Sequence, residues 1–82
     1  MKGIQRTKIP HIGKNLARAR NKLGLSQPDI HAEFGLSINS ISRMENDHDP
    51  PTLYYIYMLF KYYRVNPVFL IKGKGRILLK KN

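Results

Sequence analysis

Apolar residues recur at helical spacing in the first third of the chain. These residues are Ile12, Leu16, Ala19 and Leu23. Steps of three or four residues place all of them on one face of a helix. Gly24 follows, and glycine suits the left-handed position just past a helix end. The pattern therefore predicts a first helix that starts at Ile12 and stops before Gly24.

Two short helices joined at Gly35 are predicted next. The first begins with Ser26-Gln27-Pro28-Asp29, in which the serine can cap the helix and the proline fits its first turn. The aspartate suits the positive end of the helix dipole. The second helix begins at the cap Ser37 and has apolar residues at spacings of three, namely Ile38, Ile41 and Met44. A polar loop over residues 46–51, which closes with two prolines, ends it.

A fourth and a fifth helix complete the pattern. Thr52 can cap the fourth, whose predicted apolar face consists of Leu53, Ile56, Leu59, Phe60 and Tyr63. We expect Tyr57 to pack in the core as well and Tyr54, Tyr55, Met58 and Tyr62 to be partly exposed. Asn66-Pro67 begins a short fifth helix that ends at Gly73 and Gly75. Residues 76–82 are compatible with a short strand, a helical end or disorder.

Five helices in one short chain predict an all-α fold, a compact bundle that forms a single domain. Residues 1–11 contain Gly3 and Pro10 and show no helical period, so they are interpreted as a flexible N-terminal arm. The predicted organisation is an arm over 1–11, a helical domain over 12–73 and a short tail over 74–82.

Composition excludes several classes of protein. The chain has no cysteine, which excludes disulfides and cysteine–zinc sites. It has no apolar run long enough to span a membrane and no signal-peptide stretch at the N-terminus, so a cytoplasmic protein is expected. His48 stands between Asp47 and Asp49, but three adjacent loop residues do not converge on one ion, and no metal or other cofactor is expected. No nucleophile, base and orienting acid form a set, so the chain is not expected to be an enzyme.

The net charge of +10 is distributed in three blocks. Residues 1–25 and residues 51–82 carry seven basic side chains each and no acidic one. Residues 26–50 carry all five acidic side chains, and Arg43 is their only Lys or Arg. The total charge points to a polyanionic partner, with nucleic acid first and an anionic membrane surface second.

The spacing of residues 12–73 resembles that of the phage repressor/Cro-like helix-turn-helix family, also called the XRE family. The residues that carry the resemblance are Leu23-Gly24-Leu25-Ser26-Gln27, Ile30, Phe34-Gly35-Leu36-Ser37, Ile41-Ser42-Arg43-Met44-Glu45-Asn46, Pro51-Thr52-Leu53, Val65-Asn66-Pro67 and Leu70. The resemblance implies a lambda-repressor-like bundle with its motif over residues 27–46. Gly35 is expected to have a positive φ in a turn too crowded for a side chain.

The resemblance also implies that helix 37–45 enters the major groove of double-stranded DNA. Ile38, Asn39 and Arg43 would contact base edges: Ile38 a thymine methyl, Asn39 an adenine and Arg43 a guanine. Backbone contacts would come from Gln27, Ser37, Ser40, Asn46 and Lys14, with Lys61, Arg6 and Lys8 as further candidates. The alternatives are a partly buried Ile38, and an Arg43 that contacts a phosphate, is solvated or is paired with Asp47.

Four further family positions concern the packing of the helices. Arg20 and Glu45 stand where family members often join the first helix to the end of the recognition helix by an ion pair. His31 stands where the family usually has alanine, in the crossing of the two motif helices, and is expected to be squeezed there. Phe60 replaces a residue that is commonly small.

The function expected from the resemblance is sequence-specific DNA binding as a transcriptional regulator, a repressor, acting as a homodimer on a palindromic operator. The alternative is an antitoxin or another protein-interaction module that uses the tyrosine-rich helix 52–63 and the tail to bind a toxin. Membrane-surface binding through Ile77-Leu78-Leu79 has weak support, because this apolar run is short.

Overall fold

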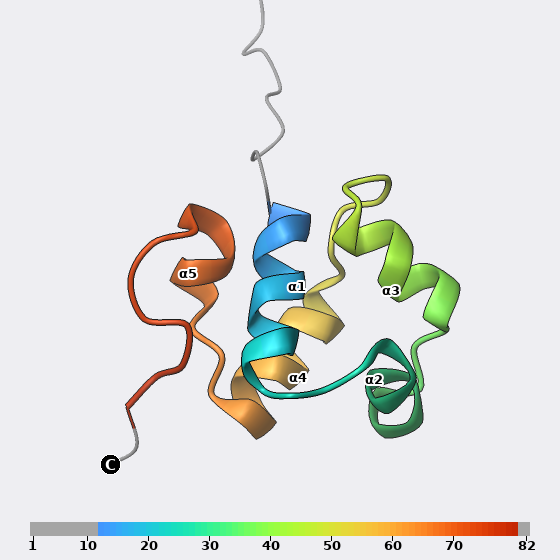
Figure 1. The fold of residues 1–82 in the computed structure, drawn as a ribbon, viewed down its shortest axis with the longest axis horizontal. Helices are drawn as coiled ribbons and strands as arrows, with labels where there is room; N and C mark the ends of the chain where they lie inside the picture. The colour runs from blue at the N-terminus through green and yellow to red at the C-terminus, as the bar shows by residue number, and fades with distance from the viewer. Residues whose placement is uncertain (1–11, 81–82) are drawn as a thin grey trace, which may run out of the picture.

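The computed structural model describes residues 12–80, so the expectations for the arm and for its candidates Arg6 and Lys8 lie outside the described residues. Five helices follow one another: α1 (Ile12–Lys22), α2 (Gln27–Phe34), α3 (Ile38–Glu45), α4 (Leu53–Tyr63) and α5 (Pro67–Lys72). Figure 1 shows α1 in the middle of the bundle, with α5 on one side and α3 on the other. The all-α prediction is confirmed, with helix bounds close to those expected.

Polar caps define the helix ends, as predicted. Ser26 accepts a hydrogen bond from the backbone N–H of Asp29, whose carboxylate accepts one from the Ser26 N–H, which completes a capping box. At the next three helices, the side chains of the caps Ser37, Thr52 and Asn66 each accept one backbone N–H of the first turn. Each cap satisfies a backbone donor that the first helical turn leaves without a partner.

Gly35 ends α2 in the expected left-handed conformation, with φ 76°. The expectation of a crowded turn is wrong, because a Cβ built at Gly35 would meet no atom within 4 Å. Glycine is therefore favoured here by the backbone dihedral alone.

The core lies where α1 packs against α3 and α5, and where α2 packs against α3. Its buried apolar side chains are Leu16, Ala19, Ile30, Phe34, Ile41, Met44, Tyr55, Leu59, Val65, Phe69 and Leu70. Asn15 is the buried polar residue among them, and its Nδ2 donates to the Leu70 carbonyl at 3.0 Å. This bond anchors α1 to α5 without leaving a buried amide unpaired.

The predicted face of α4 is confirmed in part: Leu59 is fully buried, and Ile56 and Tyr63 pack against the core, but four other side chains were assigned to the wrong side. Tyr55 is fully buried, whereas Tyr57 is 53% exposed, Phe60 42% and Leu53 84%. The buried positions are Tyr55 and Leu59, four residues apart and hence on one face. Nearly every position of this helix is apolar or aromatic, so the spacing of its apolar residues does not indicate which face is buried.

His31 is exposed, which contradicts its expected place in the helix crossing. The neighbouring Ile30 faces the core instead and is fully buried. The His31 Nδ1 lies 2.7 Å from the carbonyl oxygen of Leu36, beyond the turn. The histidine is therefore accommodated at the surface, beside the loop that joins α2 to α3.

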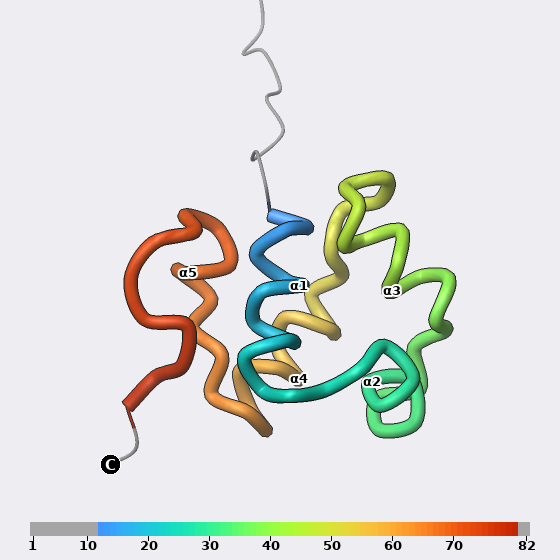
Figure 2. Tube along the Cα trace, viewed as in Figure 1, coloured from blue at the N-terminus to red at the C-terminus, as the bar shows by residue number. Residues whose placement is uncertain are grey.

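The C-terminal segment folds back beside the connection between α4 and α5, as the Cα trace in Figure 2 shows. Val65 and Leu78 form an isolated antiparallel bridge. The Asn66 N–H donates to the Ile77 carbonyl at 2.8 Å, and the Leu79 N–H donates to the Arg64 carbonyl at 2.7 Å. Of the three conformations left open by the sequence, this short strand-like pairing is the one observed.

Candidate nucleic-acid interface

Helix α3 has a buried side and an exposed side. Ile41 and Met44 face the core, and α3 is fixed through them to α1 and α2. Ser37, Ile38, Asn39, Ser40 and Arg43 are exposed. Asn39 and Arg43 are four residues apart, so they lie one above the other on the same face. Ile38 is 42% exposed, so a large part of its side chain is accessible to a ligand.

Two serines occupy the N-terminal end of α3. The Ser37 Oγ accepts a hydrogen bond from the Ser40 backbone N–H at 3.0 Å. The same hydroxyl donates to the Ser40 Oγ at 2.9 Å. The exposed start of this helix therefore carries two small hydroxyl groups at its positive end, where an anion is favoured.

Arg43 is held by Asp49 from the loop that follows α3. The Arg43 Nε donates to one carboxylate oxygen at 2.8 Å and its Nη2 donates to the other at 3.1 Å. The pair is exposed, with 48% and 46% of the two side chains accessible. The bidentate contact raises the pKa of Arg43, and the same hydrogen bonds lower the pKa of Asp49. Asp49 is thus the observed ion-pair partner, in place of Asp47.

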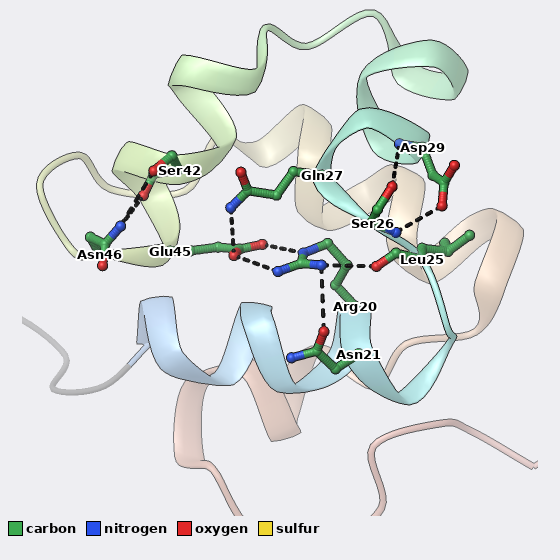
Figure 3. A network of polar contacts seen from close by, with 9 residues as sticks. All are labelled: Arg20, Asn21, Leu25, Ser26, Gln27, Asp29, Ser42, Glu45 and Asn46. Carbon is green, nitrogen blue, oxygen red and sulfur yellow. Dashed lines mark hydrogen bonds and ion pairs between the residues drawn. The ribbon is translucent and has the colours of Figure 1, made fainter.

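A network of polar side chains joins α1, α2 and the end of α3, as Figure 3 shows. The Arg20 Nε and Nη2 donate to the two carboxylate oxygens of Glu45 at 2.7 and 2.9 Å. The Arg20 Nη1 donates to the Leu25 carbonyl at 2.8 Å, and the Gln27 Nε2 donates to Glu45 at 3.1 Å. The ion pair implied by the resemblance is therefore present, and Gln27 extends it to the start of α2.

Little of this ion pair is accessible to water, with exposed fractions of 13% for the Arg20 side chain and 6% for Glu45. The hydrogen bond to Glu45 raises the pKa of Arg20 although burial opposes the charge. Burial raises the pKa of the Tyr55 hydroxyl far above its usual range, and the charge of Glu45 adds to the effect. The Tyr55 hydroxyl has no hydrogen-bond partner among residues 12–80.

The start of α1 is attached to the end of α3 at Gly13. The Gly13 N–H donates to the Asp47 carboxylate at 2.9 Å. A Cβ at Gly13 would lie 2.5 Å from the Met44 carbonyl oxygen and 2.6 Å from that of Glu45. Asp47 has a positive φ of 61°. The sequence does not predict this contact, because nothing in the helical spacing of α1 singles out Gly13.

The remaining candidate backbone contacts lie on different elements, namely α1, α2, α4 and the end of α3. Lys14 is exposed and directly follows Gly13, so it lies near the end of α3. Asn46 donates from Nδ2 to the Ser42 carbonyl at 2.9 Å, which closes the last turn of α3. Gln27 has its side chain bonded to Glu45. The Lys61 ammonium lies over the rings of Tyr57 and Tyr62.

The described part of the chain holds neither of two other classes of site. No group of three or more His, Cys, Asp or Glu side chains there is arranged to hold a metal ion. Within residues 12–80, no helix has both the length and the apolar character needed to cross a membrane.

Comparison with known protein families identifies the family of this chain. The family model described as Helix-turn-helix covers residues 16–70. No curated protein and no solved structure matches the chain. The matched segment runs from α1 to α5 and contains the turn at Gly35, the exposed face of α3 and the Arg20–Glu45 ion pair. The chain therefore belongs to the XRE type of the helix-turn-helix family and is a DNA-binding regulator of transcription.

Proposed function

We propose that this protein is a sequence-specific transcriptional repressor that inserts α3 into the major groove of double-stranded DNA. The observation that carries the proposal is the composition of the exposed face of α3. Asn39 and Arg43 lie on it together, and Ile38 is accessible beside them. An amide that can pair with adenine, a guanidinium that can pair with guanine and an apolar group for a thymine methyl match the code of base edges in this groove.

The backbone contacts would come from the edges of α3. Ser37 and Ser40 lie at its start, and Lys14 and Asn46 lie near its end. At the start of α2, the Gln27 backbone N–H would approach a phosphate, while the Gln27 side chain stays on Glu45. Such contacts position the protein on the duplex, whereas specificity comes from the groove.

The experiment that tests the function is selection of bound sequences from a random pool of duplex DNA. We expect an enriched motif made of two inverted half-sites, about 34–36 Å apart, because a symmetric dimer presents two recognition helices one DNA turn apart. A single half-site would support α3 as the reader and contradict the homodimer. Absence of any enrichment over random DNA would contradict sequence-specific binding.

Arg43→Ala is expected to weaken binding to the selected sequence by ~1–3 kcal/mol and to relax the preference at one base position. The loss is specific because the guanidinium would donate two hydrogen bonds to one guanine. Fluorescence anisotropy with the selected site, its single-base variants and random DNA measures the effect.

Lys14→Ala is the matched control for Arg43→Ala, because it also removes one exposed positive charge. It should weaken binding to the selected site and to random DNA to the same extent. If Arg43→Ala does likewise, the assigned base contact is wrong.

The exposed aromatic face of α4 favours a second activity beside DNA binding. Tyr54 is 47% exposed, Tyr57 53% and Tyr62 56%, and Leu53 on the same helix is more exposed still. Tyrosines of this kind are enriched where proteins bind one another. The proposed homodimer, or a partner such as a toxin, would use this face. Analytical ultracentrifugation of the protein without DNA separates the two, because only the homodimer forms in a pure sample.

A further inference from the structure

The loop after α3 places the Asp49 carboxylate against Arg43. Arg43 is the only Lys or Arg between residues 26 and 50. The backbone N–H groups of His48 and Asp49 both donate to the Arg43 carbonyl, at 2.9 and 3.3 Å. The loop therefore folds back onto the residue whose side chain it contacts. Pro50 and Pro51 follow directly and restrict the backbone on the far side of Asp49.

The same loop is also fixed to α1. Asp47 accepts the hydrogen bond from the Gly13 N–H and holds a positive φ of 61°. Asp49 is thus carried by a segment that is hydrogen-bonded to both α1 and α3, not by a free loop. This placement is preorganised before any DNA arrives.

The geometry of the ion pair leaves the base-reading edge of Arg43 accessible. A guanidinium has five N–H donors, and Asp49 takes the side edge formed by Nε and Nη2. The second Nη2 hydrogen and both Nη1 hydrogens are not used by this contact. The second Nη2 hydrogen and one Nη1 hydrogen form the end-on edge of the fork, which can donate two parallel hydrogen bonds to O6 and N7 of a guanine.

The same contact neutralises the positive charge of Arg43. A free arginine in the groove would also bind phosphate, and phosphate contacts carry no sequence information. A carboxylate beside it repels phosphates but leaves a neutral base edge accessible. The pairing thus favours the guanine contact over indiscriminate binding to the DNA backbone.

From these contacts we infer that Asp49 is a positioning residue that determines the sequence specificity of Arg43, by orienting its guanidinium toward a base and keeping it from phosphates. This inference rests on the proposed function, since it assumes that α3 lies in the major groove. Asp49 itself does not contact the DNA in this arrangement. Its contribution is visible in the ratio of specific to non-specific affinity.

Asp49→Asn tests the inference. The variant should bind random DNA more tightly, with a salt dependence steeper by as much as ~0.9 in slope, because the released Arg43 takes one phosphate. The ratio of affinities for the selected site and random DNA should fall about two- to fivefold, since exposed ion pairs are weak. Asp49→Glu keeps a carboxylate within reach of Arg43 and should retain most of the ratio.

Two controls separate this effect from a general change of charge. Glu33→Gln removes an equal charge from an exposed residue of α2, and its amide oxygen can still accept the hydrogen bond of the Tyr63 hydroxyl. It should leave the affinity ratio unchanged. Asp49→Asn introduced into Arg43→Ala should also leave the ratio unchanged, because the residue that it releases is gone. Circular dichroism checks that each variant is folded.

The outcomes distinguish the inference from the function on which it rests. An unchanged ratio in Asp49→Asn, or an equal fall of the ratio in the Arg43→Ala background, overturns the role of Asp49 while the protein still selects its site. If the wild-type protein binds the selected site no better than random DNA, the proposed function fails and the inference fails with it.

Discussion

Arg20→Ala is expected to cost about 3–5 kcal/mol in the free energy of unfolding, because the Glu45 carboxylate would stay buried without its partner. Glu45 is 6% exposed, so water cannot replace the guanidinium without opening the interface of three helices. The substitution also removes the donor to the Leu25 carbonyl. Domains of this kind are stable by only about 5–15 kcal/mol, so a large part of the protein's stability would be lost.

Urea unfolding followed by circular dichroism measures this loss. Lys22→Ala is the matched control, because it removes an exposed positive charge from the same helix and should change stability by no more than about 0.5 kcal/mol. Replacing Arg20 and Glu45 together by methionine and leucine should cost much less than Arg20→Ala, since no buried charge then remains unpaired. A small effect of Arg20→Ala alone would show that Glu45 is solvated in solution.

Gly13→Ala is expected to destabilise the protein by about 3 kcal/mol, the upper part of the range for overpacked sites. The added Cβ would lie 2.5 and 2.6 Å from two backbone carbonyl oxygens at the end of α3. Backbone atoms cannot rotate away as a side chain does, so α1 and α3 must separate. Because α3 is the proposed reader, binding to the selected DNA site should weaken as well.

Whether Gly13→Ala destabilises or stabilises the protein tests the close contact directly. Glycine in a helix is less favourable than alanine by ~1 kcal/mol, so helix propensity alone predicts that Gly13→Ala stabilises the protein. Gly24→Ala is the control: it has open space around its Cβ but a left-handed φ of 75°. It should cost ~1–2 kcal/mol from the backbone alone and leave DNA affinity unchanged. A stabilising Gly13→Ala would contradict the close contact.

Local features of the fold were predictable because they depend on neighbouring residues. The cap at Ser26 and the left-handed Gly35 follow from which residue types satisfy a helix end. The ion pair between Arg20 and Glu45 could be predicted only from the resemblance, since the two residues stand 25 positions apart. Spacing within one helix does not report which helix lies opposite.

Contacts that depend on tertiary packing were not predictable in the same way. In α4 an apolar or aromatic residue stands at nearly every position, so the burial of Tyr55 is decided by tertiary packing, in which its ring meets Phe34 of α2. The loop after α3 carries one acidic residue on each side of His48. Whether Asp47 or Asp49 reaches Arg43 depends on the positive φ at Asp47, which no pattern of the sequence specifies.

The junction at Gly13 also makes the start of α1 and the end of α3 one rigid unit. The Gly13 N–H is bonded to Asp47, and the backbone leaves no room for a Cβ between the two helices. Lys14, the next residue, is exposed, so the position of its backbone relative to α3 is set by this contact and not by a flexible connection. A ligand bound to α3 would therefore meet this lysine without the entropic cost of ordering the backbone that carries it.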